Sequence, residues 1–248
     1  MVSIGRGIRW FNNYLVEVEF CKNNDFCFMQ VWYQNGKILV NDIPDTKIEY
    51  IKTIGFPVII HAVFAPIDFE IYGDDLLEKV KILEMNEVII HPVSKKCEVN
   101  ANTQSELVEQ AKLFSTKAKK QGVTWYLENN SVIDAFHYKP TDIKKVYEAD
   151  DYVEQLLDVA HIDNYGHLKE IIDIKFPKCL HIAGKHFDVP HEHLPLPQGD
   201  IDYGIVFKQY LSGFSGRIIL EIDGTDEEIL LSKNIIEQAI NTLSIEIR

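Results

Sequence analysis

The stretch Pro57-Val-Ile-Ile-His61 is a short apolar run that ends on a residue able to bind a metal ion. The same arrangement recurs at His91, which follows Val88-Ile-Ile, and again at Glu128 and Glu221. A single histidine or glutamate is ambiguous, whereas a ligand type that recurs at the same point of successive runs requires a common cause. We therefore expect the ends of these runs to meet around one shared site.

Eight short apolar runs, rich in β-branched residues, predict eight β-strands. Segments with helical periodicity lie between several of these runs, as parallel βα units require. The chain has 248 residues, 46% of them hydrophobic, and an eight-stranded α/β barrel typically has roughly 250 residues. No linker divides the sequence, so we expect residues 1–248 to form one domain, a (β/α)8 TIM barrel of the α/β class. The expected strands are Ser3–Trp10, Phe26–Tyr33, Phe56–Phe64, Glu87–Val93, Val123–Glu128, Tyr152–Ala160, Lys178–Ala183 and Arg217–Ile222. The expected helices are Gly73–Met85, Thr103–Gln121, Thr141–Ala149, Asp163–Asp173 and Ser232–Leu243.

Two of the expected helices begin with residues that are typical of N-caps. Asn102 and Thr103 precede Glu106, and Ser232 precedes a stripe of apolar residues. Side-chain oxygens at such positions accept hydrogen bonds from the first free N–H groups of a helix. We expect both helices to start there.

One long irregular stretch, GKHFDVPHEHLPLPQG at Gly184–Gly199, follows the seventh expected strand. A polar loop of this length within a compact domain is usually functional. His191 and His193 alternate within it, as an extended segment would present them on one side. We expect this loop to add ligands to the shared site.

The charge of the chain disfavours nucleic acid as a partner. Lys and Arg total 25 against 38 Asp and Glu, which gives a net charge of −13. Affinity for phosphate backbones comes largely from Lys and Arg, and the sequence has only four arginines. Bound metal ions would offset some of the negative charge locally, so nucleic acid is disfavoured rather than excluded.

The cysteines and the hydropathy pattern predict a cytoplasmic protein. Four cysteines occur without a CxxC pair or dense spacing, which is typical of reduced thiols. The first residues lack the apolar core of a signal peptide, and no window has the run of apolar residues that a spanning helix needs. We expect no membrane association, and assembly into a homo-oligomer is left open.

Nine residues are candidate metal ligands because a parallel barrel brings the C-terminal ends of its strands to one face. Asp158 and His161 are three positions apart, so both can face that end if the strand turns into a helix there. Imidazole and carboxylate groups suit zinc, manganese and related divalent ions. The set exceeds what one ion can use, so two or three ions are plausible, and we expect between one and three. The nine residues are His61, His91, Glu128, Asp158, His161, His181, His191, His193 and Glu221.

The candidates for substrate binding are fewer. Trp32 and Phe64 lie at predicted strand ends, together with Trp10 and Tyr33, and aromatic rings there can stack on a sugar. Lys185 directly follows the seventh expected strand and is the best candidate for a cation that reaches a phosphate or hydroxyl group. Packing at the barrel rim and a solvated loop lysine are the alternative interpretations. Three further histidines lack this positional logic and are interpreted as structural: His137, His167 and His186.

Six motifs occur in an order that resembles the xylose-isomerase-like TIM-barrel superfamily. They are VIIHPV (88–93), YLENN (126–130), LLDVAH (156–161), CLHIAGK (179–185), HEHLPLPQGDID (191–202) and ILEID (219–223). The resemblance covers about Phe56 to Asp223. This superfamily contains sugar and sugar-phosphate isomerases and epimerases together with apurinic-site nucleases of the endonuclease IV type, which form AP endonuclease family 2.

The two branches imply different sites. The isomerase and epimerase branch implies one metal held by Glu128, Asp158, His181 and Glu221, with the two glutamates also placed as catalytic proton-transfer groups. The nuclease branch implies three zinc ions. Its ligand sets would be His61, His91 and Glu128; Glu128, Asp158, His181 and Glu221; and His161, His191 and His193.

The sequence departs from the pattern of the family at three positions. Nucleases of this type have an aspartate where this chain has His191, so the third set is all histidine unless Asp188 serves instead. Gln198 stands in place of the glutamate of a GEG turn, and Pro197 replaces its first glycine. The role usually held by that turn is therefore in doubt.

We expect a metal-dependent isomerase or epimerase of a small sugar or sugar phosphate. A metal that polarises a carbonyl, and carboxylates that move a proton, supply what that reaction needs. The alternative is an endonuclease IV-like zinc phosphodiesterase with a multinuclear site. The acidic chain has few positive charges with which such an enzyme would bind DNA. A third possibility is a barrel that binds a ligand without turnover.

Overall fold

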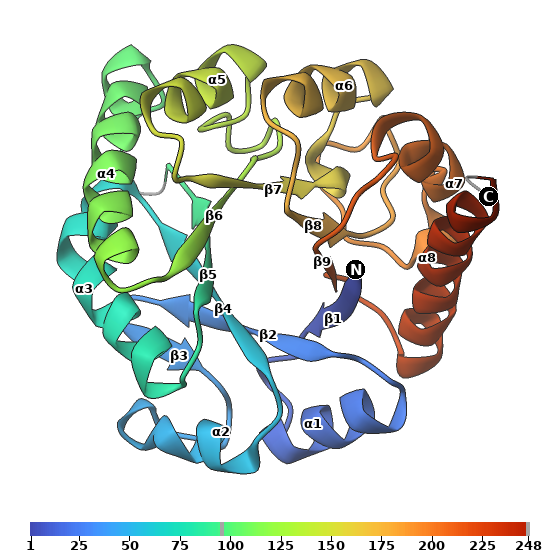
Figure 1. The fold of residues 1–248 in the computed structure, drawn as a ribbon, viewed down its shortest axis with the longest axis horizontal. Helices are drawn as coiled ribbons and strands as arrows, with labels where there is room; N and C mark the ends of the chain where they lie inside the picture. The colour runs from blue at the N-terminus through green and yellow to red at the C-terminus, as the bar shows by residue number, and fades with distance from the viewer. Residues whose placement is uncertain (95–96, 247–248) are drawn as a thin grey trace.

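Eight parallel strands close into a barrel, and helices surround it (Figure 1). The computed structural model describes residues 1–94 and 97–246, with side chains described up to residue 241. The barrel closes because β1 pairs with both β2 and β9, and every barrel strand is parallel to its two neighbours. The barrel strands are β1 (Ser3–Gly7), β2 (Phe28–Gln34), β4 (Val58–Phe64), β5 (Glu87–Pro92), β6 (Thr124–Glu128), β7 (Glu154–Asp158), β8 (Cys179–Ile182) and β9 (Arg217–Leu220). The helices are α1 (Tyr14–Asn23), α2 (Glu49–Ile54), α3 (Pro66–Ile82), α4 (Ala101–Lys120), α5 (Pro140–Ala149), α6 (Tyr165–Ile174), α7 (Tyr203–Ile205) and α8 (Asp226–Glu246).

This architecture confirms the predicted (β/α)8 TIM barrel. All eight expected strands and five expected helices are present; most ends shift by a few residues, whereas α3 and α8 begin at Pro66 and Asp226, well before the expected Gly73 and Ser232. The expected strand Tyr152–Ala160 is shorter, because the chain turns into a 3₁₀ turn at Val159–His161 directly after β7. The short strand β3 (Lys37–Leu39), antiparallel to β2, was not predicted, and neither were α1, α2 and α7.

Both predicted helix starts are wrong. Asn100, not Asn102 or Thr103, caps α4, and its side chain accepts hydrogen bonds from the backbone N–H groups of both of those residues. Ser232 lies inside α8 rather than at its start, and its hydroxyl donates to Glu228 O. The helix begins earlier because Thr225 Oγ1 accepts from Glu228 N, which satisfies its first turn.

Each barrel strand points alternate residues into the barrel, so residues two apart share its interior. Seven strands contribute one residue each to a compact buried cluster that forms the floor of the barrel. Two positions further along, the same strands present polar residues, which form a second layer above the floor. The floor residues are Phe28, Ile59, Ile89, Tyr126, Leu156, Cys179 and Ile219. The residues above them are Gln30, His61, His91, Glu128, Asp158, His181 and Glu221.

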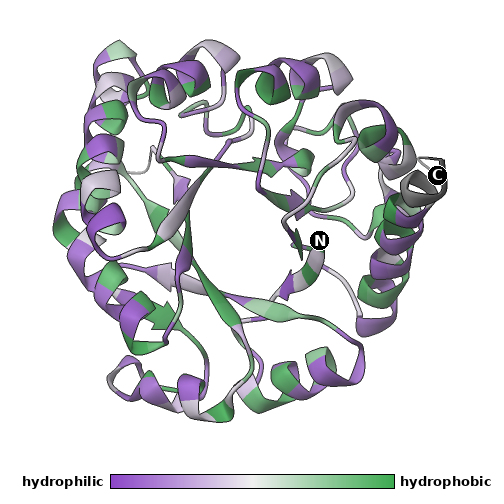
Figure 2. Ribbon diagram, in the orientation of Figure 1, coloured by the Kyte–Doolittle hydropathy of each residue, from purple (hydrophilic) through white to green (hydrophobic). Residues whose placement is uncertain are grey.

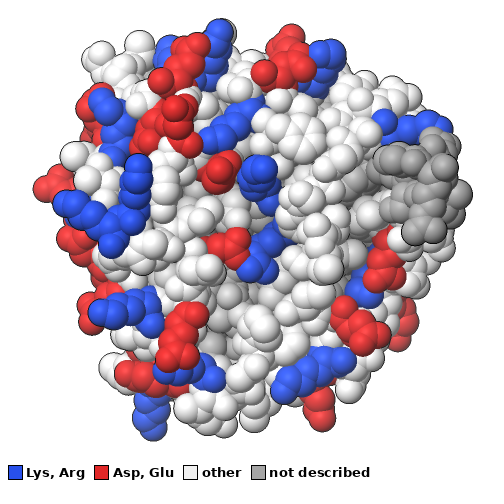
Figure 3. All heavy atoms as spheres, viewed as in Figure 1, with Lys and Arg blue, Asp and Glu red and all other residues white. Residues whose placement is uncertain are grey.

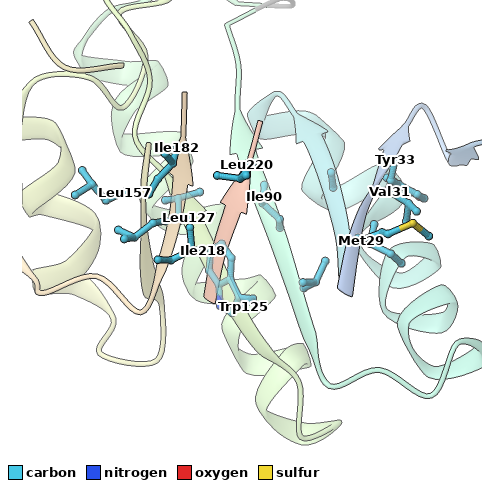
Figure 4. Close-up of a cluster of buried hydrophobic side chains, with 14 of the residues drawn as sticks. Met29, Val31, Tyr33, Ile90, Trp125, Leu127, Leu157, Ile182, Ile218 and Leu220 are labelled. Carbon is cyan, nitrogen blue, oxygen red and sulfur yellow. The ribbon is translucent and has the colours of Figure 1, made fainter. Parts of the chain in front are cut away.

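The intervening strand residues pack outward against the helices and form the main hydrophobic core. Figure 4 shows part of this core, including Val31, Ile90, Trp125 and Leu157. Trp125 Nε1 donates to Ser115 Oγ of α4 at 2.8 Å, so its polar atom is satisfied although the side chain is fully buried. Figure 2 shows hydrophobic residues along the strands and mixed residues on the outer helices, as expected when one helix face is buried.

The loop after β8 is anchored at both ends. Gly184 and Leu194 exchange two backbone hydrogen bonds, of 2.6 and 2.9 Å, and Asp200 N donates to Lys185 O. The segment between them carries His191 and His193. The loop is therefore closed on itself by backbone contacts and holds its histidines at the mouth of the barrel.

The surface charges carry both signs. Figure 3 shows acidic and basic side chains interspersed over the face in view, many as neighbouring pairs. In the part of the chain that the structure describes, no helix is long and apolar enough to cross a membrane.

Gly216, directly before β9, is expected to tolerate no side chain. A Cβ at this position would overlap Lys178 O, the backbone carbonyl that precedes β8 and pairs with Arg217 N. We expect Gly216→Ala to lower the free energy of unfolding by about 1–3 kcal/mol, because backbone must shift to admit the methyl group. Gly7→Ala is the control, since its Cβ would meet no atom closer than 3.8 Å. Urea denaturation measures the free energy of unfolding of both variants. Equal losses of stability in the two would contradict this account.

Candidate metal centre

All nine predicted ligand residues converge at the C-terminal end of the barrel. They form three groups, in each of which one potential ligand atom per residue lies within 4.8 Å of the others. Glu128 belongs to two groups. The groups are His61, His91 and Glu128; Glu128, Asp158, His181 and Glu221; and His161, His191 and His193. That these residues bind metal ions stays a prediction.

The second group forms the centre, and its atoms converge on His181 Nδ1. This nitrogen lies 2.8 Å from Glu221 Oε2, 3.3 Å from Glu128 Oε1 and 3.6 Å from Asp158 Oδ2. All four atoms are buried and have no hydrogen-bond partner. His181 Nε2 donates to Gln30 Oε1 at 2.8 Å, so in the neutral ring the lone pair on Nδ1 faces three carboxylate oxygens. Such an arrangement is stable only with positive charge between these atoms, and a divalent cation fits it.

The pKa values show how strongly the centre attracts positive charge. Burial opposes ionisation of Glu128, yet the surrounding histidines, His91 foremost, hold its pKa well below the usual range. The same balance, with His181 as the main partner, lowers the pKa of Glu221 to about 2. Burial opposes protonation of His181, but the carboxylates outweigh it and raise its pKa. A proton and a metal ion therefore compete for the same lone pair.

Asn129, directly after β6, orients Asp158 at the end of β7. Its Oδ1 accepts from Asp158 N at 2.8 Å, and its Nδ2 donates to Asp158 O at 3.2 Å. Asp158 Oδ1 accepts from Ala160 N at 2.7 Å. These three bonds leave Asp158 Oδ2 as the atom that points to the centre.

In the three-histidine group, two ring nitrogens face each other. His161 Nδ1 donates to Asn129 O and His193 Nδ1 donates to Glu221 O, each at 2.8 Å. Their Nε2 atoms lie 3.4 Å apart, and the ring of His191 lies 5.0 Å from that of His161. Burial lowers the pKa of His161 to about 4, so its ring is neutral at neutral pH. Burial opposes protonation of His193, but Asp158 and Glu221 outweigh it and raise its pKa, so His193 Nε2 can donate to His161 Nε2. A metal ion between the two Nε2 atoms would take the place of that hydrogen.

In the first group, both histidines contact Glu128. His61 Nε2 lies 2.8 Å from Glu128 Oε2, and His91 Nδ1 lies 3.1 Å from Glu128 Oε1. His91 Nε2 donates to Asn130 Oδ1. Burial opposes protonation of His91, but Glu128 and its other partners outweigh that effect and raise its pKa to about 9. His61 differs, because burial lowers its pKa.

Gln30 is a residue of the site that sequence reasoning missed. It is fully buried on β2, and its amide contacts both His61 and His181. Glutamine is not a usual metal ligand, so a search for ligand types passes over it. The signal that could have found Gln30 was its position along β2. Each ligand on the other strands comes two positions after a floor residue, and Gln30 comes two positions after the floor residue Phe28.

A cavity of about 800 Å³ opens onto the centre. Glu128, Glu221 and members of the other two groups line it, and Trp32 and Trp10 form an aromatic wall. The ring of Tyr33, the next residue along β2, points outward into the core, where its hydroxyl donates to Asp75 Oδ2. The Trp32 ring lies 4.7 Å from that of His61. The predicted position of Trp32 beside a substrate is therefore compatible with the geometry.

The other two predicted substrate contacts lie away from this cavity. Phe64 is fully buried and packs edge-on against Phe69. Lys185 is 1% exposed and its Nζ donates to Ile162 O at 2.6 Å, while burial lowers its pKa. Phe64 lies three positions after His61 on β4, so it faces outward into the core, and Lys185 is turned toward Ile162 O. The geometry therefore supports packing and loop anchoring rather than contact with a substrate.

The three histidines interpreted as structural lie outside the three groups, as does Asp188. His137 is fully buried, and burial lowers its pKa to about 3. His167 pairs with the Asp163 backbone, and His186 with Glu192.

Comparisons with solved structures agree with this fold. A D-tagatose 3-epimerase-like protein matches with a TM-score of 0.81 and 15% identity, over 99% of this chain and 100% of that chain. An L-ribulose 3-epimerase matches with a TM-score of 0.77 and 12% identity, over 99% and 97%. The IolI protein, in a structure with a bound zinc atom, matches with a TM-score of 0.70 and 14% identity, over 97% of each chain. The chain has the fold of the xylose isomerase-like TIM barrels. No protein-family model matches the sequence, and no curated protein matches it significantly, so the likeness at these identities is one of fold.

The four-residue centre of this xylose isomerase-like barrel is expected to bind a divalent ion through Asp158. Asp158→Asn removes a charged ligand but keeps a similar shape, so zinc or manganese affinity should fall more than about 100-fold, beyond the 10–100-fold typical for loss of an outer partner. Asp188→Asn is the matched control, because Asp188 is exposed and outside the three groups. Isothermal titration calorimetry measures the metal affinity of both variants. Equal affinities for the two would rule out the assigned centre.

Proposed function

We propose that the protein is a divalent-metal-dependent isomerase or epimerase of a small, unphosphorylated sugar. The observation that carries the proposal is the convergence of four buried, unpartnered ligand atoms beneath a cavity of about 800 Å³. Such a cavity is large enough for a monosaccharide. The likeness to epimerase structures supports the same chemistry.

Glu128 and Glu221 are the proposed proton-transfer groups. They line the cavity from β6 and β9, strands that are not neighbours in the barrel. Both pKa values are lowered, so both carboxylates are ionised at neutral pH and can accept a proton from carbon. A divalent ion held at the centre would polarise the sugar carbonyl and make that proton more acidic. One glutamate would remove the proton, and either the same or the other glutamate would return it.

The charges around the cavity favour an unphosphorylated sugar. Among the described residues that line it, Arg9 is the only lysine or arginine. Its Nη2 lies 3.0 Å from Glu17 Oε1 and 2.8 Å from Asp226 Oδ1. Its charge is therefore already paired, whereas a phosphate group needs a cation that is free to bind it. The aromatic wall suits the apolar face of a sugar ring.

One observation favours a second candidate function, an endonuclease IV-like zinc phosphodiesterase. The facing Nε2 atoms of His161 and His193 are suited to a further ion, and multinuclear sites assist phosphoester cleavage. The paired Arg9 and the net charge of −13 weigh against a nucleic-acid substrate. We therefore place isomerase or epimerase chemistry first.

Solvent exchange tests the reaction class without knowledge of the natural substrate. The metal-loaded protein is incubated in D₂O with a panel of unphosphorylated pentoses and hexoses and with their phosphates. We expect proton NMR to show deuterium entering beside the carbonyl of at least one unphosphorylated sugar, and Glu221→Gln to lose this exchange. Glu109→Gln, on the exposed face of α4, is the control and should keep it. Exchange confined to the phosphates would overturn the substrate class, and an unchanged rate in Glu221→Gln would overturn the site.

Metal content separates the two candidate functions. We expect elemental analysis of the purified protein to give one firmly bound manganese or similar ion per chain, since one group of four ligands supplies a full coordination set. About three zinc ions per chain, together with hydrolysis of a phosphodiester, would support the second candidate instead.

A further inference from the structure

The amide of Gln30 lies between two histidines of the site. Its Oε1 accepts from His181 Nε2 at 2.8 Å, and its Nε2 donates to His61 Nδ1 at 3.2 Å. Gln30, His61 and His181 are each at most 1% exposed. Water therefore cannot replace either partner, and the hydrogen bonds of the amide decide where each ring carries its hydrogen.

An amide has one accepting end and one donating end, so it treats the two rings differently. The ring that faces the oxygen must present an N–H, and the ring that faces the NH₂ group must present a lone pair. Both neutral rings then carry hydrogen on Nε2. For His181 this leaves the Nδ1 lone pair toward Glu128, Asp158 and Glu221. For His61 it leaves an N–H toward Glu128.

This N–H has a clear partner. His61 Nε2 lies 2.8 Å from Glu128 Oε2, so it donates a hydrogen bond there. The other oxygen, Glu128 Oε1, has no hydrogen-bond partner and points to the centre. Gln30 thus acts on Glu128 through His61 and on the centre through His181.

The packing of His61 restricts its alternatives. Its ring lies 4.7 Å from the Trp32 ring and 5.1 Å from the His181 ring. The ring is therefore confined, and the nitrogen that faces Glu128 can become a metal ligand only if its hydrogen moves to Nδ1. The NH₂ group of Gln30 blocks that change because it needs an acceptor at Nδ1.

We propose that Gln30 is a positioning residue that commits His181 to binding the ion and His61 to holding Glu128, so that His61, His91 and Glu128 hold no ion of their own. The proposal rests on the proposed function only in taking the four-residue centre as an ion site. It limits the number of ions whichever sugar is the substrate. Rotation of the amide by half a turn would exchange the two roles, but it could not make both histidines ligands.

The test replaces the amide with a carboxylate of the same shape. In Gln30→Glu both ends accept, so His61 carries its hydrogen on Nδ1 and its Nε2 lone pair becomes free. With zinc in excess, we expect elemental analysis to give one more zinc per chain than in the wild type. Gln34→Glu is the matched control, because it adds a carboxylate to the cavity from the same strand without facing either histidine. It should leave the zinc count unchanged.

Nitrogen-15 NMR of the histidine rings provides a second readout that does not depend on the variant folding. In the zinc-loaded wild type, we expect His61 to carry hydrogen on Nε2, and in Gln30→Glu on Nδ1. Hydrogen on Nδ1 of His61 in the wild type would overturn the proposal, as would equal zinc counts in Gln30→Glu and wild type. If the zinc counts and the hydrogen positions are as expected but no sugar exchanges its proton with D₂O, the proposed function is overturned and the role of Gln30 is not.

Discussion

Three buried carboxylates need positive charge beside them, and the rest of the site depends on this constraint. Glu128, Asp158 and Glu221 meet at one nitrogen of His181, and burying unpaired charges costs far more than packing can return. A divalent cation would supply positive charge at the point where these atoms meet. Because only the folded barrel assembles the four residues, binding of such an ion would also stabilise the fold. The layer of polar residues above the floor would therefore be more stable with the ion bound than without it.

The two-residue period of the strands makes this arrangement possible. Seven strands place an apolar residue at the floor and a polar residue above it, so the ligands stand on packed side chains. On β1 the corresponding residues are glycines. Gly5 leaves room for the ring of Phe28, which a Cβ would approach to 2.6 Å. Gly7 lines the cavity beside Glu221, so its missing side chain leaves space on one side of the barrel for a substrate.

Much of this arrangement could be predicted from sequence because it follows from periodicity. Alternating strands and helices imply a barrel, and the common end of its strands brings His61, Glu128 and Glu221 together. Other features depend on contacts that no local pattern contains. The role of Gln30 depends on rings 31 and 151 positions away. Lys185 is buried because the backbone after β8 turns it toward Ile162 O, and the start of α4 depends on the extended backbone of Asn100.

The histidines of the site are oriented by two kinds of partner, and the difference bears on how such barrels change their metal content. Backbone carbonyls fix His161 and His193, and these acceptors persist whatever side chains surround them. The orientation of His61 depends on side chains alone, since the Gln30 amide and the Glu128 carboxylate together keep its hydrogen on Nε2. A single exchange of amide for carboxylate would therefore free a ligand without moving the backbone. In a barrel of this kind, the number of ions is then decided by the inner polar layer as much as by the ligands themselves, and the chemistry that follows from that number can change while the fold stays the same.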